Sequence, residues 1–129
     1  MKDKQFVVQE HETADGVHWD LMLEQDEVLT TFRLEEPPEQ VLVHPVPAEK
    51  IFDHPLRFLS YEGPVQKGTG RVRIVERGCW RPEKCDRRVV GANDDSPLRV
   101  GRLILEGTIL SGTFTLVRTS PIQWRFARL

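Results

Sequence analysis

The sequence predicts a mainly β fold, a single small curved β-barrel of about seven or eight mostly antiparallel strands with long loops and little helix. Alternation of apolar and polar residues with a period of two recurs along the 129 residues, and no segment sustains the 3.6-residue period of an amphipathic helix. Nine prolines and nine glycines divide the short apolar runs, which is typical of strands joined by tight connections. A closed barrel is favoured over an open sheet because closure leaves no unpaired strand edge.

The chain begins with a pattern typical of consecutive strands. The apolar run 5–10 predicts a first strand, and the strict alternation over 17–24 predicts a second. Polar residues at 25–27 form a plausible turn into a third strand over 28–34, which makes an antiparallel hairpin. One face of the second strand is core and the other is free for chemistry. The core face holds Trp19, Leu21 and Leu23, and the opposite face holds His18, Asp20, Met22 and Glu24.

The segment after this hairpin is interrupted by proline. Pro37 and Pro38 make residues 35–40 irregular, because proline donates no ladder hydrogen bond and restrains the residue before it. A short strand is expected at 41–43 and one helical turn at 48–52.

The C-terminal half returns to alternation. Its two main connections are a glycine-rich turn over 63–70 and a polar, basic loop over 79–97, whose last five residues have turn chemistry. Alternation places five strands around these connections, at 56–61, 71–77, 98–106, 112–118 and 122–128.

Length and composition limit the class of protein. A chain of 14.9 kDa with 39% hydrophobic and 29% charged residues builds one domain, residues 1–129, with a core of its own. These values exclude a disordered polyelectrolyte, and apolar runs of only a few residues exclude a segment that spans a membrane. The first residues show no targeting pattern, so a cytoplasmic protein is expected. Cys79 and Cys85 have neither zinc-knuckle nor redox spacing and are expected to be reduced.

Charge is divided unevenly along the chain. Residues 1–66 carry five Lys and Arg against fourteen Asp and Glu, whereas residues 67–129 carry thirteen against six. The net charges of the two halves are therefore −9 and +7. Two such halves sharing one core suggest a cation-binding wall and an anion-binding wall of the same groove.

Two histidines and one aspartate form a candidate metal site. His18 and Asp20 are two residues apart on a strand, so their side chains point to the same face. His11 lies at the end of the preceding strand or in the loop after it, and the intervening segment 12–17 can fold it back beside His18. Two imidazoles and one carboxylate suit Mn²⁺, Fe²⁺ or Zn²⁺ and leave positions open for water or substrate. A purely structural role for the three residues is the alternative.

Several motifs in a fixed order carry a resemblance that spans nearly the whole chain. They are Phe6-Val7-Val8-Gln9-Glu10-His11, His18-Trp19-Asp20-Leu21-Met22-Leu23-Glu24, Asp53-His54-Pro55-Leu56, Tyr61-Glu62-Gly63, Arg77-Gly78-Cys79-Trp80, Leu105-Glu106-Gly107 and the run from Leu110 to Arg118. In this order they resemble the 3′-phosphoesterase domain of bacterial and archaeal DNA ligase D, a module that heals DNA ends and also exists as a free-standing protein.

The resemblance implies a small β-barrel with its site on the concave face, and a Mn²⁺-dependent hydrolase of DNA repair by non-homologous end joining. Such an enzyme removes a terminal ribonucleoside or a phosphate from the 3′ end of DNA or of RNA-tipped DNA. By resemblance, His11, His18 and Asp20 bind the metal, His54 contacts the scissile phosphate, and His54, His18 and Asp20 are the catalytic residues. The implied partners are DNA 3′ ends and a separately encoded ligase or polymerase, without a membrane, and the chain is expected to be a monomer.

Three features depart from the family pattern. Met22 stands where the family has an arginine, and a thioether cannot grip a phosphate bidentately. Phe58 stands where the family has a tyrosine, and the spacing from His11 to His18 is one residue longer. Losing a phosphate-binding arginine predicts weaker activity. The candidates for a replacement guanidinium, chosen by their alternation with apolar neighbours, are Arg57, Arg71 and Arg73.

Other interpretations remain open. A catalytically weakened or inactive relative would bind DNA ends or a repair partner through the same groove, and a structural barrel with incidental histidines is a third hypothesis. His44 is expected in a surface loop, and Trp80 and Trp124 are expected to pack in the core or at its rim. A basic cluster suits either the DNA backbone or solvent, and consists of Arg77, Arg81, Lys84, Arg87 and Arg88.

Overall fold

The protein is built almost entirely from antiparallel strands. The computed structural model describes residues 4–65, 69–83 and 101–129. The elements are β1 (Lys4–Thr13), β2 (Gly16–Gln25), β3 (Val28–Leu34), the 3₁₀ helix η1 (Pro38–Leu42), β4 (Val46–Pro55), the 3₁₀ helix η2 (Leu56–Leu59), β5 (Gly63–Val65), β6 (Gly70–Pro82), β7 (Gly101–Gly107), β8 (Ser111–Arg118) and β9 (Gln123–Arg128).

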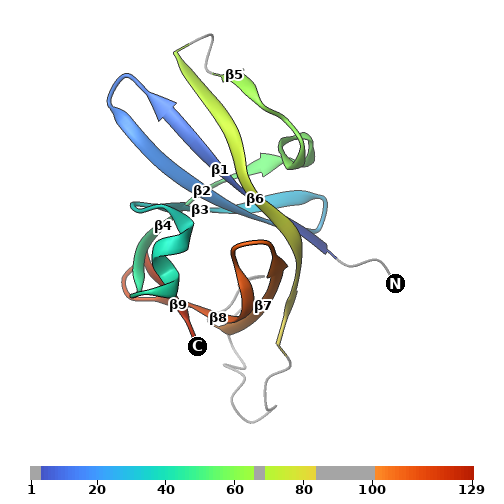
Figure 1. Ribbon diagram of the computed structural model, residues 1–129, viewed down its shortest axis with the longest axis vertical. Helices are drawn as coiled ribbons and strands as arrows, with labels where there is room; N and C mark the ends of the chain where they lie inside the picture. The colour runs from blue at the N-terminus through green and yellow to red at the C-terminus, as the bar shows by residue number, and fades with distance from the viewer. Residues whose placement is uncertain (1–3, 66–68, 84–100) are drawn as a thin grey trace.

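The sheet closes on itself through the pairing of β1 with β6. Eight strands follow one another around the barrel in the order β1, β2, β3, β4, β9, β8, β7 and β6, and β6 pairs with β1 over almost its whole length. The short β5 adds to the free edge of β6 above the barrel, so that β6 lies between β5 and the projecting β1–β2 hairpin (Figure 1). The prediction of a small antiparallel barrel with little helix is confirmed.

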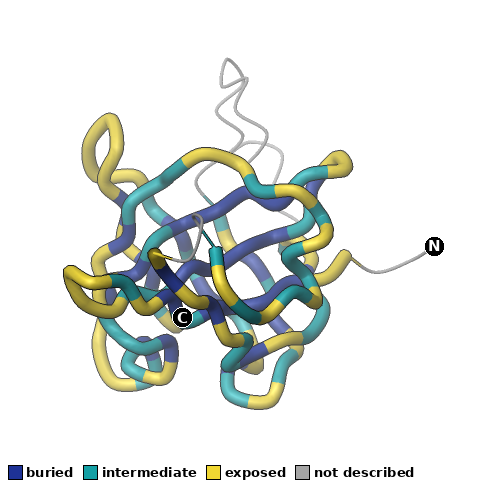
Figure 2. Tube along the Cα trace, turned by 90° about the horizontal axis from the view of Figure 1, so that it is seen from above, coloured by how far each residue is buried: buried dark blue, intermediate teal, exposed yellow. Residues whose placement is uncertain are grey.

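The barrel interior is filled by one apolar core to which every barrel strand contributes. Alternate residues of β1 and β2 enter it, among them Phe6 and Leu21, and both tryptophans expected to pack, Trp80 and Trp124, are buried there. Phe114 and Phe126 stack with ring centroids 5.5 Å apart. Buried segments accordingly gather in the middle of the molecule, with exposed residues at the turns (Figure 2). Each large side chain buried in this way contributes about 1.5–3 kcal/mol.

Two β-bulges change which face of the wall a residue occupies. Along β1 and β6, Val8 pairs with Glu76 but Gln9 pairs with Ile74, so β6 has one extra residue. Along β3 and β4, Leu29 pairs with His54 but Thr31 pairs with Ile51, so β4 also has one extra residue. Because neighbouring strand residues face opposite sides, each bulge turns the rest of its strand over.

Three local predictions are wrong because tertiary packing overrides the local pattern. Residues 41–43 fall in and just after η1, which buries Pro38 and Val41, rather than in a strand. Residues 48–52 belong to β4 and not to a helical turn, since Ala48 pairs with Trp124 in the barrel wall. The segment 56–61 begins with η2 instead of a strand.

The basic loop begins later than expected. β6 continues to Pro82 because its last residues pair with β7 across Trp80 and Leu105. Residues 84–97 of that loop lie outside the described residues; they include Cys85 and three members of the basic cluster, Lys84, Arg87 and Arg88. In the described ranges no helix is long and apolar enough to cross a membrane.

Glu76 is a buried carboxylate on β6 that binds the turn between β7 and β8. Its Oε2 accepts hydrogen bonds from the backbone N–H groups of Ile109 and Leu110, both at 2.6 Å, and Oε1 accepts one from Thr108 at 3.1 Å. A Cβ at Gly107 would lie 2.5 Å from Glu76 Oε2, so glycine is required there. The carboxylate therefore ties the β7–β8 hairpin to the barrel wall.

Replacing Glu76 by Gln should lower the free energy of unfolding by about 2–4 kcal/mol, because the amide N–H₂ group would face backbone donors and leave them unpaired. Urea unfolding measures the effect. Glu106→Gln is the matched control: its carboxylate is half exposed and lies 3.3 Å from Arg81, so its loss should cost less than about 1 kcal/mol. Equal losses in the two variants would contradict the role of Glu76.

Candidate metal and phosphate site

His11, His18 and Asp20 come together on the outer face of the barrel wall. His11 on β1 pairs with His18 on β2, so the two rings lie side by side, and Asp20 is two residues further along β2. His11 Nδ1 lies 2.9 Å from His18 Nε2, and His18 Nε2 lies 3.8 Å from Asp20 Oδ2. One potential ligand atom from each residue lies within 4.8 Å of the other two.

This donor set fits a divalent transition-metal ion. Two nitrogens that are each about 2.1 Å from a shared ion are separated by about 3.0–3.4 Å, close to the 2.9 Å between the two rings. Burial lowers the pKa of both His11 and His18, although the negative charge of Asp20 partly opposes the effect. Both imidazoles are therefore neutral at pH 7, as a metal ligand must be.

The two carboxylate oxygens of Asp20 contact different side chains. While Oδ2 faces His18, Oδ1 accepts a hydrogen bond from Arg33 Nε at 3.2 Å. Arg33 lies directly opposite Asp20 in the β2–β3 pairing. This contact orients the buried carboxylate and brings a guanidinium to the site, where it can also meet an anion.

Gly70 makes room for the imidazole of His11. It lies on β6 opposite Thr13, and a Cβ built there would be 2.9 Å from His11 Nε2 and 3.2 Å from the carbonyl oxygen of Glu12. The backbone of β6 therefore approaches the imidazole of His11 as closely as glycine permits.

The bulge in β4 places His54 on the same face as these residues. Its Nδ1 lies 2.8 Å from the hydroxyl of Thr31, which itself donates to the carbonyl oxygen of Leu29 at 3.0 Å. Since the hydroxyl has one proton and gives it to Leu29, Nδ1 must carry the hydrogen, and Nε2 is left for a ligand. Burial lowers the pKa of His54 despite the opposing charge of Asp20, so the ring is neutral at pH 7.

η2 covers one end of this face with apolar side chains. Met22 is 1% exposed and forms a second cluster with Val7 and Leu29, against which Phe58 and its neighbours in η2 pack. Met22 therefore lies on the face expected to be free for chemistry, but it is buried there. Gln9 holds the segment in place by donating from Nε2 to the carbonyl oxygens of Phe58 at 2.9 Å and Tyr61 at 3.0 Å.

These residues line one cavity of about 350 Å³. Its lining comes from β1, β2, β3 and β4, from β5 and β6, and from η2, so it is a concave groove on the outside of the barrel. His18 is not among the lining residues but contacts His11, which is. The charged, titratable or exposed aromatic residues that line the groove include His11, Asp20, Arg33, Phe52, His54 and Arg57.

Of the three arginines suggested as replacements, Arg57 lies in the groove. Its guanidinium is over the rings of Phe58, at 4.8 Å, and Tyr61, at 5.8 Å. Arg71 and Arg73 instead line a separate surface depression with acidic residues, where Arg73 pairs with Glu10 at 2.9 Å. His44 is half exposed and pairs with Glu36, as expected for a loop histidine.

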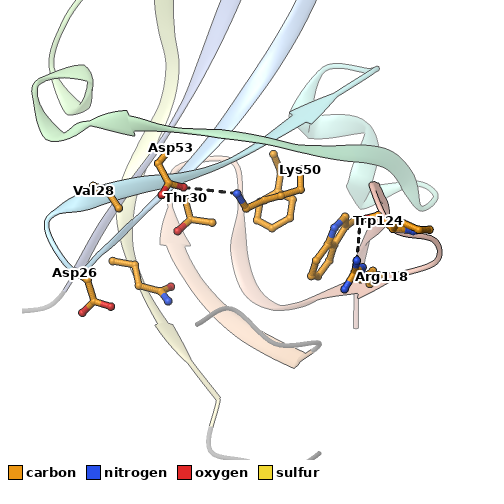
Figure 3. Close-up of a pocket in the computed structure, with 10 residues that line it drawn as sticks. Asp26, Val28, Thr30, Lys50, Asp53, Arg118 and Trp124 are labelled. Atoms are coloured by element: carbon orange, nitrogen blue, oxygen red, sulfur yellow. Dashed lines mark hydrogen bonds and ion pairs between the residues drawn. The ribbon is translucent and has the colours of Figure 1, made fainter. Parts of the chain in front are cut away.

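A second cavity, of about 470 Å³, opens on the core side of β3 and β4. Lys50 and Asp53 approach one another across it at 3.6 Å, with Trp124 and Arg118 at its other end (Figure 3). It contains none of the residues singled out in the sequence as a site. β4 therefore separates the two cavities, because Asp53 faces the cavity on the core side and His54 faces the groove.

Arg33 and Phe52 were not identified from the sequence as site residues. The contact between Arg33 and Asp20 follows from the length of the turn between β2 and β3. The central residues of this turn are Asp26 and Glu27, and both have positive φ, as in a type I′ turn. Counting outward from that two-residue turn places Arg33 opposite Asp20. A three-residue turn over 25–27 shifts the register and hides the contact. Phe52 depends on the bulge, for which the sequence has no signal.

The comparisons with known proteins all match one family. A model of the DNA Ligase D 3′-phosphoesterase domain matches residues 9–118. The multifunctional non-homologous end joining protein LigD of Mycolicibacterium smegmatis is 31% identical over 129 residues, which cover 96% of this chain and 16% of that protein. The corresponding DNA repair protein of Mycobacterium tuberculosis is 33% identical, with the same coverage. That of Pseudomonas aeruginosa is 31% identical over 89% of the chain. The chain therefore spans only 13–16% of the length of these relatives.

The ring of His54 should titrate below pH 6.5, because burial lowers its pKa. Proton NMR of the imidazole Cε1–H resonances measures the midpoint, and His54→Gln assigns the signal. Nitrogen shifts of the neutral ring should identify Nδ1 as the protonated nitrogen. Protonation at Nε2 in the neutral ring would contradict the arrangement with Thr31.

Proposed function

This chain belongs to the DNA ligase D 3′-phosphoesterase domain family, and we propose that it is a metal-dependent phosphoesterase that heals the 3′ ends of DNA in non-homologous end joining. Its substrates would be DNA strands that end in a 3′-phosphate or in a single ribonucleotide. In the first case the bond between phosphorus and the 3′ oxygen is hydrolysed, and in the second the bond between phosphorus and the 5′ oxygen of the terminal nucleoside.

The observation that carries the proposal is the convergence of His11, His18, Asp20 and His54 on one outer face of the barrel. The first three residues would hold Mn²⁺ or a similar ion, which polarises a phosphoryl oxygen and lowers the pKa of bound water. Two observations support this assignment: the imidazoles of His11 and His18 are neutral at pH 7 because burial lowers their pKa, and Arg33 orients the carboxylate of Asp20 beside His18.

His54 and the two guanidiniums of the groove would bind the phosphate. Nε2 of the neutral His54 has a lone pair, so it can take the proton of a phosphate monoester monoanion, which becomes the dianion, and the imidazolium then donates a hydrogen bond to a phosphate oxygen. Arg33 and Arg57, which line the same groove, would supply positive charge to the phosphate. They take the place of the arginine that the family has at the position of Met22.

A second candidate function is binding of DNA ends with weak or no catalysis. The burial of Met22 in an apolar cluster favours it, since no guanidinium projects from that position. Phe58 likewise contributes a ring without a hydroxyl. DNA ends would then be held for a ligase or polymerase.

The test is a primer–template with a 3′-phosphate or one 3′-ribonucleotide, incubated with and without Mn²⁺. Wild-type protein should release product only with the metal, and His18→Ala should reduce the rate by at least about 10²-fold, as expected when a metal ligand is lost. His44→Ala is the matched control because that histidine is half exposed and lies in a loop. DNA binding without product would support the second function, and neither binding nor product would contradict both.

Arg33→Ala should lower kcat/KM by about 10²-fold, comparable to the loss of one oxyanion donor. Arg33→Lys should recover part of the loss, because it keeps the charge without the planar fork. Arg73→Ala is the control, since that guanidinium pairs with Glu10 outside the groove. Mn²⁺ affinity, measured by the signal of free Mn²⁺ in electron paramagnetic resonance, separates phosphate binding from an effect on Asp20. A tenfold or larger loss of Mn²⁺ affinity would assign Arg33 to the metal site instead.

A further inference from the structure

Phe52 is an exposed aromatic residue at the rim of the groove. Its side chain is 71% exposed, and the other exposed large apolar residues of the described chain are aliphatic: Val17, Val43, Ile122 and Leu129. A single exposed apolar residue is ordinary on a protein surface. Its place in this structure is what distinguishes Phe52.

The ring of Phe52 is stacked on the ring of His54. Their centroids lie 4.8 Å apart with an interplanar angle of 21°, whereas His54 meets Phe58 edge to face at 5.5 Å. One face of Phe52 is therefore against the proposed phosphate-binding imidazole. Because the side chain is largely exposed, the opposite face remains open to a planar ligand.

The backbone presents Phe52 at this position through the β4 bulge. Phe52 and Asp53 together oppose Thr30 of β3, so that Phe52 turns to the groove while Asp53 turns to the cavity on the core side. Bulges next to functional sites commonly redirect side chains in this way. The other two rings of the groove, Phe58 and Tyr61, are partly buried and have Arg57 over them.

We propose that Phe52 is a stacking platform for the base of the nucleotide whose 3′ oxygen carries the scissile phosphate. This inference rests on the proposed function, since it requires a nucleic-acid 3′ end in the groove. A phosphate at His54 places the attached nucleotide beside Phe52, because the two rings are in contact. Arg33 and Arg57 bind its backbone charge, and Phe52 binds its base. Every base has a π face, so the platform tolerates any sequence but requires a base.

The test compares two 3′-phosphorylated DNA strands that differ only in the last nucleotide, one ending in thymidine and the other in an abasic tetrahydrofuran residue. Fluorescence anisotropy in EDTA measures binding without turnover. Wild-type protein should bind the thymidine end about tenfold more tightly, as expected for one base–aromatic stack. Phe52→Ala should bind both ends equally, with the affinity of wild type for the abasic end.

Two further variants separate stacking from other effects. Phe52→Trp should keep or increase the preference for the thymidine end, and Phe52→Leu, which keeps apolar bulk without a π face, should lose it. Val43→Ala, at an exposed apolar position outside the groove, should behave as wild type. Equal binding of the two ends by wild-type protein would overturn the proposal. Release of phosphate with Mn²⁺ from both strands would show in that case that the phosphoesterase function stands without the platform.

Discussion

The site depends on the alternation of side chains between the two faces of the barrel wall. In a β-strand one face must fill the core, so only the other face is available for chemistry. β1, β2 and β3 keep this alternation without interruption over the site, with Phe6, Leu21 and Phe32 inward and His11, Asp20 and Arg33 outward. In β4 the bulge precedes His54 and turns it to this outer face, whereas in β6 Val72 lies on this face before the bulge and Trp80 enters the core after it. The two bulges therefore complete the groove while the barrel keeps its core.

The charged groups of the groove do not follow the net charges of the two halves of the chain. The proposed metal ligands and both guanidiniums of the groove, Arg33 and Arg57, belong to the acidic first half of the chain. Described arginines of the basic half pair elsewhere, as Arg73 does with Glu10 and Arg81 with Glu106. A net charge averaged over half a chain thus misses the arrangement, since a buried carboxylate such as Asp20 responds to neighbours within a few ångström.

Met22 and Phe58 share one structural setting. Both belong to the apolar cluster through which η2 packs against the outer face of the barrel wall. Gln9 binds the same segment through two backbone carbonyls. The groove is lined by His11, Asp20 and His54, and its two guanidiniums come from β3 and from η2.

The sequence by itself determined the β-barrel class, the alternating faces of the first strands and the placement of His18 and Asp20 together on one polar face of the second strand. These follow from a period of two, which is a local property of the chain. Only the tertiary structure decided that residues 48–52 form a strand, that 56–59 form η2, and that His54 and Phe52 face the groove. The reason is that a bulge is an offset between two strands and a register is a relation between them. Neither exists until distant segments pair, so a pattern within one segment cannot specify them.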